Sequence, residues 1–167
     1  MIRPYRSPDR TDVIRLFREF MQELTPPPLR SEFETYVETA SREELGRIEQ
    51  YYFSREGQGF WVADPSGVVG MVGVERHSET SAELRRMAVD KAHRRQGIGR
   101  DLLQVAEAFC SDFGYRTVVL STSELQVPAM RLYEDSGYHL IRTETAVNAS
   151  HKAVGAGLTR YHYEKPL

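Results

Sequence analysis

The sequence predicts a single mixed α/β domain spanning residues 1–167, and three observations support this fold class. Two stretches with apolar residues at helical spacing precede three consecutive strand-like segments, and helix and strand patterns alternate after them. A chain of 167 residues, 40% of them hydrophobic, is long enough to bury one core. No internal repeat, low-complexity segment or linker divides the chain into further domains.

The N-terminal third is predicted to be a short strand followed by two helices. The segment IRPY, residues 2–5, suits an edge strand because it contains a proline. Apolar residues then recur at helical spacing from Asp9 to Leu24, and the three prolines of TPPPL end that helix. A second helix is expected from Ser31 to Phe53, and the glycines of REGQG close it.

The middle of the chain is predicted to be an antiparallel meander of three strands. The segments GFWVAD, VVGMVGVERH and AELRRMAVD are separated only by the short turns PSG and SETS. Strict alternation along the third segment places Arg85 and Arg86 on opposite faces of the sheet. Whichever of the two faces the cleft is a candidate to hold a carboxylate of the substrate, and a solvated sheet face is the alternative.

The last third alternates helices and strands. Apolar residues from Leu102 to Phe113 predict a helix that ends at Gly114. The strand RTVVLST follows, and because a helix connects it to the strand before, the two are expected to pair in parallel. VPAMRLYEDSG predicts a short helix, and YHLIRTET and TRYHYEKPL supply two final strands joined by a long loop over residues 146–158.

Composition and charge exclude several classes of protein. The formal net charge of −2 gives no overall basic field that would recruit nucleic acid. No apolar run approaches the roughly 18 residues of a membrane span, and the N-terminus has no signal-peptide core. We therefore expect a cytoplasmic protein with neither a nucleic-acid nor a membrane partner.

Cysteine and histidine usage argues against a metal site. Cys110 is the only cysteine, which excludes an intramolecular disulfide, and its helical context favours a buried structural thiol over a nucleophile. The five histidines never recur at the spacing of a metal-binding helix. We expect no metal cofactor.

The stretch RRQGIG, residues 94–99, carries the clearest functional signal. It joins a predicted strand to a predicted helix, where free backbone N–H groups and the helix dipole favour an anion. Gly97 and Gly99 allow a diphosphate to approach the backbone, and Arg94 and Arg95 add positive charge. The alternative is a plain strand-to-helix connection with a solvated basic rim.

Two well-known phosphate-binding motifs do not match this turn. A P-loop requires Gly-Lys followed by Ser or Thr, whereas Arg100 and Asp101 follow here. A Rossmann fingerprint requires a third glycine or alanine where Leu102 stands. The pattern that does match is Arg/Gln-x-x-Gly-x-Gly/Ala.

With that pattern, the sequence resembles the GNAT superfamily of N-acetyltransferases. The resemblance covers nearly the whole chain: the order of elements, MAVD before the turn, RRQGIG itself, and LYEDSGY after the next strand. It implies the GNAT fold, with the element order β-α-α-β-β-β-α-β-α-β-β and acetyl-CoA as co-substrate. In this family the strand before the turn splays from its parallel neighbour, and the pantetheine arm lies between the two.

The resemblance also implies a set of coenzyme-binding residues. Backbone groups of the splayed strand would pair with pantetheine, and backbone groups of the turn would hold the pyrophosphate. The candidates are Met87, Ala88, Val89, Arg94, Arg95, Gln96, Gly97, Ile98, Gly99, Arg100 and Gln126. Gln126 departs from the family pattern, because many members have an asparagine there, although its amide offers the same groups one methylene further out.

Two residues are candidates for the chemistry. Tyr133 occupies the family's tyrosine position in LYE, where the phenol typically faces the coenzyme sulfur, so it is the candidate general acid. The alternative is a helix tyrosine that packs on the sheet. Glu83 precedes the coenzyme-binding strand with the offset of the catalytic glutamate in histone-type lysine acetyltransferases, so it is the candidate base, and an exposed glutamate at a turn is the alternative. Glu75 and His77 are weaker candidates for the base.

The acceptor pocket is less well defined by the sequence. We expect the first two helices, TPPPLR and the 146–158 loop to enclose it. Six aromatic residues are candidates to line it, although aromatics at such spacing more often belong to a core. They are Phe20, Tyr36, Tyr51, Tyr52, Phe60 and Trp61. Val89 or its neighbour is the candidate backbone donor to the developing oxyanion.

These residues lead to one functional hypothesis and one alternative. The hypothesis is an acetyl-CoA-dependent N-acetyltransferase that acts on a primary amine of a small molecule, or less readily of a peptide, by direct transfer in a ternary complex. The alternative is a module of the same fold that binds acyl-CoA as a sensor or scaffold without useful catalysis. Family members often pair through their C-terminal strands, so the resemblance also allows a homodimer.

Overall fold

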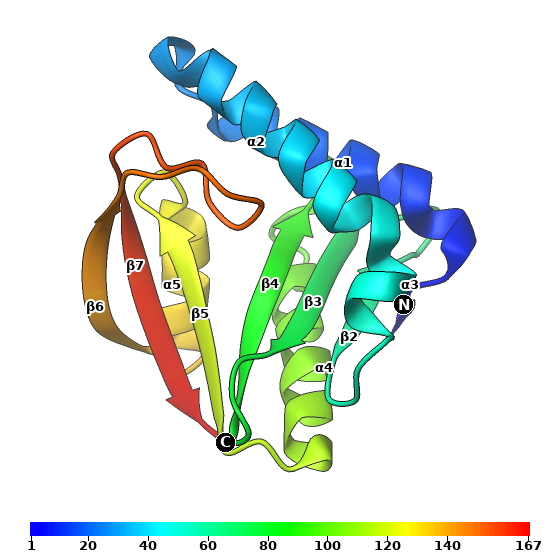
Figure 1. Cartoon of the computed structure of the whole chain (residues 1–167). Helices are drawn as coiled ribbons and strands as arrows, with labels where there is room; N and C mark the ends of the chain where they lie inside the picture. The colour runs from blue at the N-terminus through cyan, green and yellow to red at the C-terminus, as the bar shows by residue number, and fades with distance from the viewer.

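The computed structural model describes residues 1–167 and contains one seven-stranded sheet with helices on both faces (Figure 1). The strands are β1 (Ile2–Pro4), β2 (Gly59–Ala63), β3 (Gly70–Arg76), β4 (Ser81–Val89), β5 (Thr117–Ser123), β6 (His139–Ala146) and β7 (Leu158–Pro166). The helices are α1 (Arg10–Leu24), α2 (Arg30–Glu43), α3 (Ile48–Tyr52), α4 (Ile98–Phe113) and α5 (Val127–Asp135). This confirms the predicted mixed α/β class.

The strand order in the sheet is β1-β2-β3-β4-β5-β7-β6. Strands β2, β3 and β4 form the predicted antiparallel meander, and β1 is an edge strand beside β2. Strand β5 pairs in parallel with β4, as the intervening helix α4 predicts. The predicted long loop joins β6 to β7, which pair with each other in antiparallel fashion.

Strands β4 and β5 pair over only three residues of each strand. Residues 81–83 of β4 face 117–119 of β5, and no further pairs form beyond Glu83. Figure 1 shows the two strands close together at one end and well apart at the other. The rest of β4 therefore has no strand neighbour on this side, which is the splayed geometry expected from the family resemblance.

Two hydrophobic cores cover the two faces of the sheet. One lies between the sheet and α1, α2 and α3, and includes Phe17 and Tyr52. The other lies on the opposite face beneath α4 and α5, and includes Leu102 and Tyr163. Helix α4 is flanked by Gly97 before its first residue and Gly114 after its last, both in the left-handed region, so the predicted C-terminal glycine is confirmed.

The predicted helix over residues 31–53 is wrong because it is interrupted at Glu44. Helix α2 ends at Glu43, a short 3-10 turn covers Leu45–Arg47, and α3 then begins at Ile48. Glu44 has a non-helical backbone (φ −131°, ψ −68°), and its side chain is completely buried. A buried carboxylate needs partners, and those of Glu44 come from strand β4.

The predicted alternation of side chains along β4 is also wrong at Arg86. The pairing register between β3 and β4 shifts between Met71 and Gly73, which is a β-bulge, and Arg86 adopts a positive φ of 57°. The extra residue reverses the alternation after it. Arg85 and Arg86 therefore reach the same face of the sheet, where both bind Glu44.

Candidate active site

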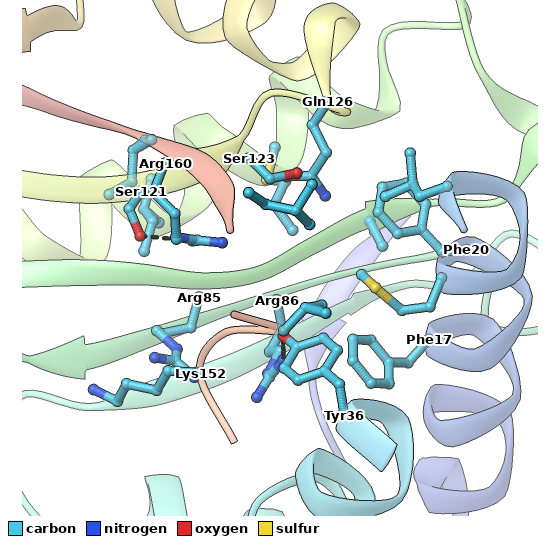
Figure 2. A pocket seen from close by; sticks show the side chains of 18 of the residues that line it. Phe17, Phe20, Tyr36, Arg85, Arg86, Ser121, Ser123, Gln126, Lys152 and Arg160 are labelled. Atoms are coloured by element: carbon cyan, nitrogen blue, oxygen red, sulfur yellow. Dashed lines mark hydrogen bonds between the residues drawn. The ribbon is translucent and has the colours of Figure 1, made fainter. Parts of the chain in front are cut away.

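A pocket opens where β4 and β5 diverge, with a volume of about 120 Å³. Its wall combines side chains from α1, α2, β4, β5, α5, β7 and the loop before β7. Figure 2 shows Arg85, Arg86 and Tyr36 on one side of this space and Ser121, Ser123, Arg160 and Gln126 on the other. The pocket is therefore lined both by β4, the strand expected to bind the coenzyme, and by α1, α2 and the loop before β7, which were expected to enclose the acceptor.

Tyr133 lies at this pocket, as the general-acid hypothesis requires. Its side chain comes from α5 and is only 6% exposed. Its ring packs against Tyr138 and Tyr163, so its position is fixed by aromatic contacts. Burial raises the pKa of Tyr133 well above that of an ordinary tyrosine, so the phenol is protonated and able to donate.

Glu83 also lines the pocket, and it faces Glu75 across the β3–β4 ladder. Lys152 lies close to both carboxylates, with Nζ 3.0 Å from Glu75 Oε2 and 3.5 Å from Glu83 Oε2. Arg85 Nη1 lies 3.8 Å from Glu83 Oε1. The side chain of Glu83 keeps 19% of its surface exposed, so water reaches its carboxylate.

A buried ionic cluster forms the floor of the pocket. Glu44 Oε2 accepts a hydrogen bond from Arg85 Nη2 at 2.9 Å, and Glu44 Oε1 accepts one from Arg86 Nε at 3.0 Å. The Tyr52 hydroxyl donates to the same carboxylate, and Arg86 Nη1 donates to the Tyr36 hydroxyl at 2.6 Å. Burial opposes the ionisation of Glu44, but Arg86 and Arg85 outweigh it and lower its pKa to about 2.

This cluster changes the expectation for the two arginines. Both Arg85 and Arg86 face the pocket, but both guanidinium groups already bind Glu44 and neither is free for a substrate carboxylate. Glu44 is a member of the site that was not among the residues predicted from the sequence. The signal was present, because Glu44 follows the buried Ala40 by four residues and so continues the buried face of α2.

The turn before α4 leaves a continuous run of backbone donors free. The N–H of His93 donates to Asp90 O and that of Asp101 donates to Gly97 O, and none of the N–H groups of residues 94–100 donates to a protein carbonyl or side chain. A Cβ added at Gly97 would meet no atom within 4 Å, so the backbone is open to its surroundings there. Such a turn fits an anionic group at the helix N-terminus.

The side chain of Arg94 does not face this turn as expected. Its Nη1 lies 2.9 Å from Glu23 Oε2, its Nε donates to Val89 O at 2.9 Å, and the guanidinium covers the ring of Phe20. Arg94 therefore ties the turn to α1. Its charge is already paired, whereas Arg95 and Arg100 are exposed and unpaired.

Most of the candidate aromatic residues belong to the core. Phe20 and Tyr36 line the pocket, whereas the other four do not. Tyr52 and Phe60 are completely buried in the core beneath α1 and α2, and Trp61 belongs to the core beneath α4. Gln126 lines the pocket, and its Oε1 accepts a hydrogen bond from the Thr122 hydroxyl, so its NH₂ group is left to donate.

Three further findings concern the cysteine, membrane-spanning helices and metal-binding groups. Cys110 is completely buried in α4, as predicted, and burial raises the pKa of its thiol to about 12. No helix is both long and apolar enough to cross a membrane. The His, Cys, Asp and Glu side chains form no group of three or more that could hold a metal ion.

Comparison with known proteins identifies relatives of this chain. It is 40% identical over 105 residues to human N-acetylaspartate synthetase, which covers 62% of this chain and 35% of that protein. It is 38% identical over 109 residues to human N-acetyltransferase 8B, which covers 62% of this chain and 48% of that protein. The chain thus spans about half or less of the length of these relatives.

A solved structure and a family model also match this chain. An acetyltransferase of the GNAT family from Staphylococcus aureus Mu50 has a similar structure, with a TM-score of 0.77 at 21% identity over 100% of this chain and 98% of that one. The model of the acetyltransferase (GNAT) family matches residues 16–138. Since this match covers well over half of the sequence, the chain belongs to the acetyltransferase (GNAT) family.

Proposed function

We propose that this protein transfers the acetyl group of acetyl-CoA to a primary amine of a small molecule. The observation that carries the proposal is the continuity of the site: the free N–H groups of residues 94–100, the unpaired edge of β4 and the pocket with Tyr133 form one path. The family uses acetyl-CoA as its co-substrate. The names of both relatives describe N-acetylation, which agrees with an amine as acceptor.

The turn and strand β4 would hold the coenzyme. The N–H groups of Gln96, Gly97, Ile98 and Gly99 would donate to the pyrophosphate, with Arg95 and Arg100 adding charge. The side chain of Arg94 has no part in this proposal, because Glu23 already pairs with it. Along β4, backbone groups of residues 87–89 would pair with the pantetheine arm, and Gln126 would donate from the opposite side.

The chemistry requires two proton transfers. The acceptor nitrogen forms a bond to the thioester carbonyl carbon, and the carbon–sulfur bond breaks. Glu83 would take the proton from the amine, directly or through water, and Tyr133 would give a proton to the departing thiolate. The N–H of Val89 is the proposed donor to the charge that develops on the carbonyl oxygen.

Direct transfer in a ternary complex follows from the absence of a suitable nucleophile. Cys110 is buried in α4, and its raised pKa of about 12 keeps the thiol protonated. Ser121 lines the pocket, but its hydroxyl oxygen accepts a hydrogen bond from Arg160 and has no base beside it. Neither Cys110 nor Ser121 is therefore suited to carry an acyl-enzyme intermediate.

A thiol-release assay distinguishes this proposal from the sensor alternative. Purified protein is mixed with acetyl-CoA and amino acids, polyamines, aminoglycosides or lysine peptides, and the free thiol is measured while calorimetry reports acetyl-CoA binding. We expect acceptor-dependent thiol release with at least one small amine. Tight binding of acetyl-CoA without thiol release for any amine would favour the sensor.

A further inference from the structure

Arg160 is the one cation of the pocket that has no carboxylate partner. It lies on β7 opposite Ser123, and its Nη2 donates a hydrogen bond to Ser121 Oγ at 2.7 Å. No aspartate or glutamate oxygen lies within 4.0 Å of its guanidinium. Figure 2 shows the group projecting from the β5–β7 side of the pocket, across from Arg85 and Arg86.

The other cations that line the pocket are all paired. Arg85 and Arg86 share Glu44, and Lys152 lies between Glu75 and Glu83. Four cations therefore meet three carboxylates, and one positive charge remains without a counterion. The guanidinium of Arg160 carries it.

An unpaired guanidinium in such a place is costly for the fold. Desolvation by burial lowers the pKa of Arg160 from its ordinary value and the charge of Arg85 lowers it further, whereas the more distant carboxylates of Glu83 and Glu144 oppose this. Glu144 pairs instead with His162 and Arg142. On folding, the guanidinium of Arg160 loses hydration and gains one hydrogen bond, to the Ser121 hydroxyl. Because this exchange does not stabilise the fold, a bound ligand explains the position of Arg160 better.

The side chain also lies on the correct face of the sheet for an acceptor. Its neighbours Tyr161 and Tyr163 pack into the core beneath α4 and α5, so alternation directs Arg160 to the opposite face. Glu83, the proposed base, lines the same pocket from β4. An acceptor that touches both residues would present its amine near Glu83 and an anionic group to Arg160.

We propose that Arg160 binds a carboxylate of the acceptor, and that the acceptor is therefore an amino acid or a similarly small amine with a free carboxyl group. This inference rests on the proposed acetyl transfer and specifies its substrate class. A guanidinium pairs with a carboxylate through two parallel hydrogen bonds, which fixes orientation as well as affinity. The cavity volume of about 120 Å³ suits an acceptor of this size.

The test compares acceptors that differ only in the carboxyl group. Each of the common amino acids, its carboxamide and the amine without the carboxyl group is assayed for thiol release with wild type, Arg160→Gln and Arg160→Lys. Arg142→Gln serves as the control, because Arg142 is an exposed arginine on the neighbouring strand β6 outside the pocket. Thermal unfolding of each variant checks the fold.

We expect at least one amino acid to exceed its carboxamide in kcat/KM by about tenfold or more. Arg160→Gln should remove this preference by raising KM for the amino acid about 10- to 100-fold, with KM for acetyl-CoA unchanged. Arg160→Lys should restore part of the preference because it keeps the charge. Arg142→Gln should behave as wild type.

The acceptor inference and the proposed acetyl transfer fail in distinguishable ways. If amines without a carboxyl group react as fast as amino acids, Arg160 does not select the acceptor, while acetyl transfer stands. If no acceptor releases thiol, acetyl transfer itself fails, and calorimetry of the amino acids with the CoA-bound protein then decides. Binding that requires the carboxylate and Arg160 would support the ligand site, and its absence would reject it.

Discussion

Glu44 Oε2 lies 2.9 Å from Arg85 Nη2, although 41 positions of sequence separate the two residues. Both side chains are buried, with exposed fractions of 0% and 6%. The pair joins the break after α2 to the strand that carries the proposed coenzyme edge. It thereby fixes the floor of the pocket relative to the helices above it.

Replacing Glu44 should destabilise the protein strongly. Glu44→Gln removes the carboxylate that binds both Arg85 and Arg86 and leaves the buried guanidinium of Arg86 without a counterion, so we expect the free energy of unfolding to fall by about 3–5 kcal/mol. Urea denaturation measures the change. Glu43→Gln is the matched control, because the half-exposed Glu43 contacts Arg42 at 3.4 Å and His151 Nδ1 at 3.5 Å near the surface and should change stability by less than about 1 kcal/mol. If the free energy of unfolding falls as little in Glu44→Gln as in Glu43→Gln, the buried cluster is not stabilising.

Acid should remove the contribution of the same carboxylate. The pKa of Glu44 is about 2 in the folded protein, below the value of about 4.3 for an unperturbed glutamate. The stability that its charge contributes is therefore complete above about pH 5 and is lost as the pH falls towards 2. Urea denaturation between about pH 7 and pH 3 should show the difference between wild type and Glu44→Gln shrinking with acid. A difference that stays constant would contradict the ion pair.

Removing the Tyr133 hydroxyl should slow turnover without weakening coenzyme binding. For Tyr133→Phe we expect kcat to fall about 10²- to 10⁴-fold, as for the loss of a general acid, with an unchanged Kd for acetyl-CoA. Tyr138→Phe is the control, because Tyr138 is equally buried beside Tyr133 and its hydroxyl has no hydrogen-bond partner. Because burial raises the pKa of Tyr133, wild-type kcat should not decline through loss of this proton near about pH 10. Full activity of Tyr133→Phe would reject the role.

The proposed base can be tested against its neighbour across the strand ladder. Glu83 lines the pocket, whereas Glu75, its pairing partner on β3, does not. Glu75 contacts the same two cations, Lys152 and Arg85. Glu83→Gln should lower kcat/KM for the amine about 10²-fold and alter the acidic limb of the pH–rate profile. Glu75→Gln removes the same charge and should have a much smaller effect. If both variants lose activity equally, the effect is electrostatic and Glu83 is not the base.

Two glycines at opposite ends of α4 allow a test of the coenzyme turn. Gly97 (φ 86°) and Gly114 (φ 99°) both have left-handed backbones, and a Cβ at either meets nothing within 4 Å. Alanine at either position should therefore cost a similar 1–2 kcal/mol, roughly, in the free energy of unfolding. Only Gly97→Ala should raise KM for acetyl-CoA, by about tenfold or more, because only there would the methyl group approach the pyrophosphate. Equal KM values would contradict the assignment of the turn.

The sequence was sufficient where the pattern is local. The meander, the parallel return to β5 and the helix ending at Gly114 follow from periodicity and turn residues, and the free N–H groups of the turn follow from the glycines around Ile98. The family motif also led to Tyr133, which lies at the pocket. These features depend on residues close together in the chain.

The features that the sequence did not predict depend on distant partners. The bulge at Arg86 and the helix break at Glu44 support each other through one ion cluster, and neither is visible in the periodicity of its own segment. The sequence of the turn predicts a free charge on Arg94, but Glu23 of α1, 71 positions away, pairs with it. Arg160 could be assigned to a face by alternation, but its lack of a counterion depends on every element around the pocket.

The most direct test of acetyl transfer in a ternary complex is the initial-velocity pattern with acetyl-CoA and the best acceptor both varied. Mass spectrometry of the acceptor is run on the same samples. We predict intersecting double-reciprocal lines, with one acetyl group gained by the acceptor nitrogen for each thiol released. Parallel lines, or thiol release without an acetylated acceptor, would contradict the account.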